Sequence, residues 1–168
     1  MPAIAHIGIG FAAKNAVPAI KVFWLIVAAE FIEIIFMILW GLGVEHPPTD
    51  ISPPFSPYSH SLIMGVAWSM LAGVVVFLFS RKRKLSLIIG FLVLSHTLLD
   101  FVASPKSAFY PTDTGMPLFM DYTSTYGLGL WKILVVAAIG EIGILIAGIV
   151  IYIITIRQIR VKRKCPSQ

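Results

Sequence analysis

Two ionisable residues, His96 and Asp100, lie four positions apart in an otherwise apolar run, residues 85–104. Side chains at this spacing project from one face of a helix. An ionisable group at membrane depth costs several kcal/mol unless it is paired, hydrated or bound to a metal ion. The pair therefore predicts a site that binds a cation or carries protons.

A second pair of acids, Glu30 and Glu33, occurs in the first long apolar run, at a three-residue spacing that also favours one helical face. No Lys or Arg lies deep enough in these runs to neutralise the acids, so the carboxylates must be protonated, hydrated or bound to a cation. Imidazole and carboxylate ligands suit a divalent cation. We do not expect a thiolate site, because the lone cysteine, Cys165, lies in the polar tail. Zn²⁺ is the leading candidate, with Mn, Fe and Mg as alternatives.

Three further residues have more than one interpretation. His60 begins the second apolar run beside a Pro-rich stretch, where it could bind the ion, cap a helix or lie in headgroup water. His6 lies in a short apolar segment, residues 2–13, that is long enough for a half-span or an interfacial helix. Glu141 either hydrogen-bonds a neighbour or extends a polar line, about 20 Å below the outer end of the last run.

The elements that must position these residues are membrane helices. Apolar residues make up 58% of the 168-residue chain and charged residues only 12%, with a mean hydropathy of +0.90. These values indicate an integral membrane protein. We predict one all-α domain over residues 1–168, a polytopic helical bundle with four transmembrane helices and a short N-terminal half-helix. The predicted spans, each long enough for about 30 Å of hydrocarbon, are residues 22–42, 60–80, 85–104 and 128–156.

The basic residues predict the orientation. One cluster, residues 81–84, links the second and third spans, and another lies in the tail, residues 157–168, so both belong in the cytoplasm. Lys14 and Lys21 precede the first span and agree. We therefore expect a cell-membrane protein with both termini cytoplasmic. The net charge of +5 arises mainly from these clusters, which favour anionic lipid headgroups as partners and leave no soluble basic domain for nucleic acid.

A depth estimate brings the polar residues together. Glu33 lies about nine residues below the outer end of its span and His96 about eight below that of its own, so each is roughly 12 to 14 Å deep. Asp100 is one turn higher, Glu30 about one turn lower, and His60 stands at the outer start of its span. The count predicts a funnel of ligands that descends from the outer face.

At these residues the sequence resembles the YdjM-like family of membrane-bound metal-dependent hydrolases. The resemblance covers about the first two-thirds of the chain. Four elements match the family pattern in order, with an acidic Glu-x-x-Glu where the family has Asp-x-Asp. They are Ala5-His6-Ile7-Gly8, Glu30-Phe31-Ile32-Glu33, Tyr58-Ser59-His60-Ser61-Leu62 and Ser95-His96-Thr97-Leu98-Leu99-Asp100.

The resemblance and the ligand-like residues together imply a hydrolase whose site opens outward and which cleaves a phosphoester of a lipid or lipid-linked substrate. They imply a metal bound by His60, His96 and Asp100, with Glu33 and His6 as further ligands. Glu33 or Glu30 would accept a proton from the attacking water. Aromatic residues in the connection 105–127 fit either a rim over the site at headgroup level or an ordinary interfacial aromatic belt.

Two other functions fit the same sequence. Glu30, Glu33, His96, Asp100 and Glu141 would also serve a transport or binding protein that moves protons or cations without covalent chemistry. Alternatively, the chain is a small accessory subunit or a homo-oligomer that uses the small residues Gly140, Gly143 and Gly148 to pack its helices closely.

Overall fold

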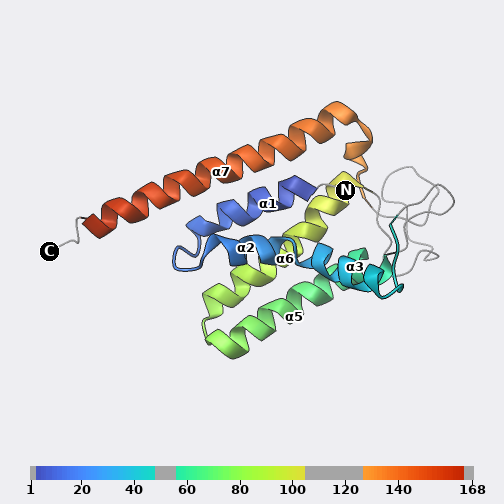
Figure 1. Ribbon diagram of the computed structural model, residues 1–168, viewed down its shortest axis with the longest axis horizontal. Helices are drawn as coiled ribbons and strands as arrows, with labels where there is room; N and C mark the ends of the chain where they lie inside the picture. Colours follow the sequence, from blue (N-terminus) through green and yellow to red (C-terminus); the bar gives the residue numbers. More distant parts are fainter. Residues whose placement is uncertain (1–2, 48–55, 105–126, 165–168) are drawn as a thin grey trace.

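The computed structural model describes residues 3–47, 56–104 and 127–164, which fold into helices and short connections (Figure 1). This confirms the all-helical class. The elements in chain order are α1 (Ala3–Ala12), the 3-10 helix η1 (Ala13–Asn15), α2 (Val22–Ala29), α3 (Phe31–Gly41), α4 (Pro57–His60), α5 (Leu62–Ser80), α6 (Arg83–Ala103), the 3-10 helix η2 (Leu130–Lys132) and α7 (Leu134–Lys164).

Three helices in the described part of the chain are long and apolar enough to cross a membrane, namely Leu62–Ser80, Arg83–Ala103 and Leu134–Val161. The first predicted span, residues 22–42, is instead two helices, α2 and α3, bent by 59°. It makes a fourth span only if the bent pair is one crossing. The run contains neither Gly nor Pro before Gly41, so its sequence pattern gave no signal of the break.

Helices α5 and α6 form an antiparallel hairpin. Arg81 turns the chain in the left-handed conformation, at a φ of 55°. Small residues let the two helices approach closely, since a Cβ on Gly90 would lie 3.2 Å from the Ser69 carbonyl oxygen. The Ser69 hydroxyl also donates to the Gly90 carbonyl at 2.8 Å, and the Ser86 hydroxyl donates to the Gly73 carbonyl at 2.6 Å.

The predicted N-terminal half-helix is α1, and it packs along α7 rather than standing apart. The two helices run in the same direction, because Ala5 contacts Glu141 and Phe11 contacts Tyr152 further along. A Cβ on Gly148 would collide with the backbone of Gly8, so this contact requires glycine. The first turn of α1 and the C-terminal end of α7 therefore lie at opposite ends of the molecule (Figure 1).

The last predicted span, residues 128–156, differs from α7 at both ends. Residues Leu130–Lys132 form a 3-10 turn, so the α-helix begins only at Leu134 and continues through Lys164. Glu141 is thus about 10 Å from the start of its helix. This is half the depth expected when the whole run is counted as helix.

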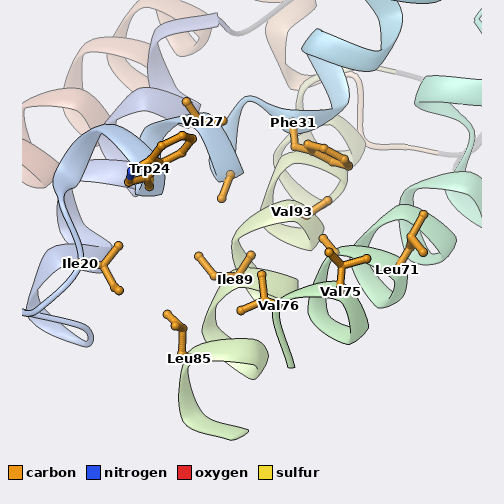
Figure 2. A pocket seen from close by; sticks show the side chains of 12 residues that line it. Ile20, Trp24, Val27, Phe31, Leu71, Val75, Val76, Leu85, Ile89 and Val93 are labelled. Carbon is orange, nitrogen blue, oxygen red and sulfur yellow. The ribbon is translucent and has the colours of Figure 1, made fainter. Parts of the chain in front are cut away.

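Apolar side chains of residues 20–31, α5 and α6 line a half-open cavity of about 500 Å³ (Figure 2). Its lining is apolar apart from the indole nitrogen of Trp24. The cavity extends from Ile20 and Leu85, near the α5–α6 turn, to Phe31 and Val93, which lie close in sequence to Glu33 and His96. The lining residues are Ile20, Trp24, Val27, Ala28, Phe31, Leu71, Ala72, Val75, Val76, Leu85, Ile89 and Val93.

Candidate metal centre

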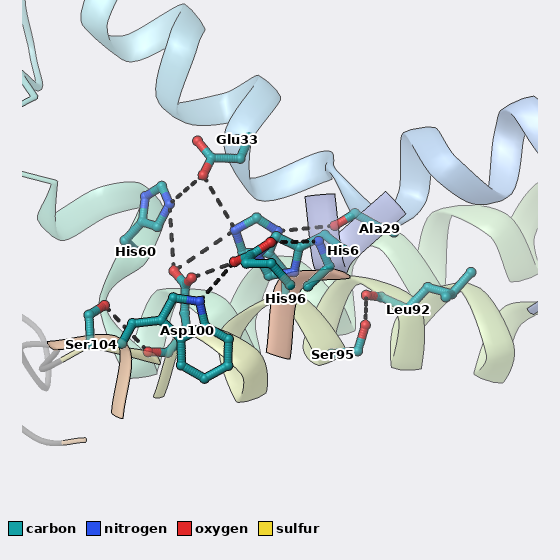
Figure 3. Close-up of polar contacts among 12 residues, drawn as sticks. His6, Ala29, Glu33, His60, Leu92, Ser95, His96, Asp100 and Ser104 are labelled. Carbon is teal, nitrogen blue, oxygen red and sulfur yellow. Dashed lines mark hydrogen bonds and ion pairs between the residues drawn. The ribbon is translucent and has the colours of Figure 1, made fainter. Parts of the chain in front are cut away.

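Three imidazole rings and two carboxylates from four different helices, α1, α3, α4 and α6, converge at one place (Figure 3). His60 Nε2 lies 3.6 Å from Glu33 Oε1 and 3.8 Å from Asp100 Oδ2. His96 Nε2 lies 3.9 Å from the same two oxygens. Counting residues along the predicted spans places Glu33 at the same depth as His96. The structure agrees, because Glu33 Oε1 lies 3.9 Å from His96 Nε2.

His6 forms a second group with the same residues of α6. Its Nε2 lies 3.7 Å from Asp100 Oδ1, and its ring stacks on that of His96 with centroids 3.8 Å apart. The donor atoms therefore fall into two overlapping groups, His6–His96–Asp100 and Glu33–His60–His96, each within 4.8 Å. His6 thus lies buried among the other candidate ligands.

The hydrogen bonds define which nitrogen of His96 faces the cluster. His96 Nδ1 lies 3.1 Å from the carbonyl oxygen of Ala29. Because a carbonyl only accepts, Nδ1 must carry the proton in the neutral ring. The lone pair of Nε2 then points at Glu33 and Asp100. This is the arrangement in which histidine binds metals, with the far nitrogen held by an oxygen.

The break between α2 and α3 contributes to the site in two ways. Ala29 is the last residue of α2, where carbonyl groups lack partners within the helix, and its oxygen is available to His96. Glu30 separates the helices with φ −92° and ψ 8°, so a new helix begins and Glu33 lies in its first turn. The positive end of that helix dipole favours a carboxylate there.

The five side chains differ in access. His6, His60, His96 and Asp100 have at most 3% of their side chains exposed, whereas Glu33 has 21%. Glu33 is therefore the most accessible of the five side chains. His60 also contacts the ring of Phe36, which covers the cluster from α3.

The separations fit a cation better than shared protons. A proton between nitrogen and oxygen brings the two atoms to about 2.7 to 3.2 Å, but the pairs here are 3.6 to 3.9 Å apart. Ligands around a tetrahedral Zn²⁺ at 2.0 to 2.2 Å are roughly 3.3 Å apart, so a contraction of a few tenths of an ångström would complete such a site. Within the described residues, His60 Nε2 and His96 Nε2 are buried without a hydrogen-bond partner. The donor set therefore fits a divalent metal.

Two predicted acids lie outside these donor groups. Glu30 belongs to neither, although its Oε1 is buried without a hydrogen-bond partner in the described structure. Glu141 accepts hydrogen bonds from the Ala5 backbone N–H and the Trp131 indole, both at 2.9 Å. It therefore anchors the first turn of α1 to α7, which is the structural interpretation of this residue.

Sequence reasoning missed Glu45 and Ser59, which lie behind His60. Glu45 is only 1% exposed and accepts from the Ser59 hydroxyl at 2.6 Å. Neither residue belongs to a periodic apolar run, so the sequence pattern carried no signal for either role. The aromatic residues predicted to form a rim in the connection 105–127 lie outside the described residues.

Comparison of the chain with protein-family models, with curated proteins and with solved structures found no match.

Proposed function

We propose that this protein is a membrane-embedded, divalent-metal-dependent hydrolase that cleaves a phosphoester of a lipid or lipid-linked substrate. The observation that carries the proposal is the convergence of three buried imidazoles on Glu33 and Asp100, with His96 held in the tautomer that binds metal. The four sequence elements that resemble the YdjM-like hydrolases contain all of these residues, and they suggest hydrolysis over simple ion binding.

The residues have separate roles in this proposal. The metal would be held by His60, His96, Asp100 and Glu33. His6, which lies beside the other oxygen of Asp100, would supply a further ligand. A bound Zn²⁺, or Mn, Fe or Mg, supplies Lewis acidity and an activated water. Because Glu33 is then a ligand, the half-buried carboxylate of Glu30, whose Oε1 is buried, is the group left to accept a proton.

The apolar cavity supports a substrate with a hydrocarbon chain. It offers about 500 Å³ of half-open space beside residues 20–31, α5 and α6, and its walls expose almost no polar atoms. Phe31 and Val93 at one end lie two residues before Glu33 and three before His96. A lipid whose headgroup reached the cluster would have an apolar compartment beside it.

We further propose that the basic turn, residues 81–84, and the end of α7 face the cytoplasm, with the cluster toward the outer face. Since α1 runs parallel to α7, the first turn of α1 points toward the outer side. In this orientation the α1–α2 connection, with Lys14 and Lys21, lies on the cytoplasmic side. This proposal differs from the predicted cytoplasmic N-terminus, because that prediction treated the α1 segment as merely preceding the first span.

Metal analysis of the purified protein tests the proposal. We expect stoichiometric metal in the wild type and its loss in His96→Ala and Asp100→Ala, because His96 belongs to both donor groups and the Asp100 carboxylate lies within 3.9 Å of all three histidines. His46→Ala is the matched control, since His46 belongs to neither group and should leave the metal content unchanged. Release of phosphate or alcohol from a phosphoester substrate should require the metal.

Two results would contradict the proposal. Wild-type protein that stays metal-free at physiological metal concentrations lacks the predicted centre. Protein that binds metal but catalyses ion flux in liposomes without any phosphoester cleavage is a transporter.

A further inference from the structure

Glu45 is a buried acid in the turn that follows α3, outside the group of candidate ligands. Gly43 adopts a φ of 72°, and the backbone N–H groups of Val44 and Glu45 both reach the Leu39 carbonyl, at 2.9 and 3.3 Å. This turn brings the chain back toward α4. The Glu45 side chain is thereby enclosed at 1% exposure next to the helix that carries His60.

The carboxylate of Glu45 accepts three hydrogen bonds from the residues just before His60. Its Oε1 accepts from the backbone N–H groups of Tyr58 at 2.7 Å and Ser59 at 3.0 Å, and its Oε2 accepts from the Ser59 hydroxyl at 2.6 Å. A buried carboxylate needs such donors, because it would otherwise lose its hydration without replacement. The position of α4 and the direction of the Ser59 hydroxyl are therefore set by Glu45.

The direction of that hydroxyl determines the proton on His60. Ser59 has one hydroxyl hydrogen, and it is donated to Glu45. The Ser59 oxygen, 2.8 Å from His60 Nδ1, must then accept from an Nδ1–H. The lone pair of His60 Nε2 consequently faces Glu33 Oε1 and Asp100 Oδ2, at 3.6 and 3.8 Å.

We propose that Glu45 is a positioning residue that acts through Ser59 to hold His60 in the Nδ1–H tautomer, ready to bind a divalent cation through Nε2. Its purpose rests on the metal centre proposed above, but the hydrogen-bond chain itself does not. The arrangement matches the Ala29 carbonyl on His96, so that both histidines present Nε2 to the same carboxylates.

Substitution Glu45→Gln tests the proposal because it preserves size while reversing one hydrogen bond. The Gln oxygen can still accept from the two backbone N–H groups, but its amide nitrogen must donate to Ser59 Oγ. The Ser59 hydroxyl is then free to donate to His60 Nδ1, which favours the Nε2–H tautomer. Nitrogen NMR of the metal-free protein, ¹⁵N-labelled at histidine and at alkaline pH where imidazoles are neutral, reports this change directly.

We expect the His60 signals to move from the Nδ1–H to the Nε2–H pattern in Glu45→Gln, and to lose the defined Nδ1–H pattern in Ser59→Ala. Zn²⁺ affinity should fall about 10- to 100-fold in both, as for other groups that orient metal-binding histidines. Ser69→Ala is the control, since it removes a buried serine hydrogen bond between α5 and α6 without contact with His60.

Unchanged His60 tautomers in both variants would overturn the proposal, and so would a Zn²⁺ affinity equal to that of the Ser69→Ala control. If Glu45→Gln does not fold, Ser59→Ala decides alone, because it leaves both backbone hydrogen bonds to Glu45 in place. If the variants show the tautomer shift but the wild-type protein does not bind Zn²⁺, Glu45 still positions His60, and the proposed metal centre is refuted instead.

Discussion

His96 links the two donor groups because its ring stacks on His6 while its Nε2 faces Glu33 and Asp100. Its other nitrogen is fixed by the Ala29 carbonyl. The ring face and both ring nitrogens of His96 are thus in contact with other groups. Another polar side chain at this position would lose at least one of these contacts. At the scale of single residues, His96 is thus the centre of the site.

The candidate ligands could be foreseen because they obey local rules. The spacing of His96 and Asp100 places both on one face of α6, and the depth of Glu33 follows from counting residues along the span. The role of Glu45 could not be foreseen, since its contacts with Tyr58 and Ser59 depend on how a loop folds back. Hydrogen bonds between a turn and a four-residue helix have no periodic signature in sequence.

The two acids at the helix break should respond differently to removal of charge. In Glu33→Gln we expect loss of bound metal, because the charged oxygen near His60 and His96 is replaced by an amide. In Glu30→Gln we expect metal to be retained while turnover falls by roughly 10² to 10⁴, the usual contribution of a general base. Metal content and hydrolysis of bis(p-nitrophenyl) phosphate by the two purified variants give the comparison.

Each variant is the other's control, since both lose one carboxylate from the same bent segment. Full metal occupancy in Glu33→Gln would exclude this residue as a ligand. Wild-type turnover in Glu30→Gln would exclude Glu30 as the proton acceptor.

Among the secondary structure elements, the break between α2 and α3 has the largest consequence for the site. An uninterrupted helix over residues 22–42 would use the Ala29 carbonyl within its own ladder and would not present it to His96. Hydrophobic pattern alone indicated a continuous span, because Phe31, Ile32 and their neighbours are as apolar as the residues before the break. At the bend the Ala29 carbonyl contacts His96 of α6, and the local sequence does not encode that contact.

The α1–α7 contact should be sensitive to the size of one residue. In Gly148→Val the new side chain collides with the backbone of Gly8, so we expect a loss of about 1 to 3 kcal/mol in the free energy of unfolding, typical of overpacking. Displacement of α1 should also move His6 from Asp100 and weaken metal binding. Unfolding by denaturing detergent and Zn²⁺ titration measure the two effects.

Gly143→Val provides the control on the same helix, because no atom lies within 4 Å of a Cβ at that position. Equal stability of the two variants would show that α1 does not pack on α7 through Gly148. These glycines had suggested assembly with another chain, but Gly148 is already used inside the molecule.

At the scale of the whole molecule, the cluster of histidines and carboxylates and the basic residues lie at opposite ends. The cluster lies where α3, α4 and the end of α6 meet, while the basic α5–α6 turn and the end of α7 lie at the far end (Figure 1). Composition and hydropathy predict the helices, and the basic residues predict this polarity. The parallel pairing of α1 with α7 joins residues 136 positions apart, as in the Ala5–Glu141 hydrogen bond, and no local pattern announces it.

The proposed orientation predicts which residues a membrane-impermeant maleimide reaches in intact cells. With Cys165→Ser as background, Val44→Cys in the exposed turn after α3 should be labelled, because that turn lies at the end of the molecule with the cluster. Lys84→Cys should be labelled only after permeabilisation, because basic connections stay in the cytoplasm. Leu78→Cys, on the exposed apolar face of α5, should react in neither case, since lipid covers it. Labelling of Lys84→Cys but not Val44→Cys in intact cells would reverse the orientation and place the site, with its substrate, on the cytoplasmic side.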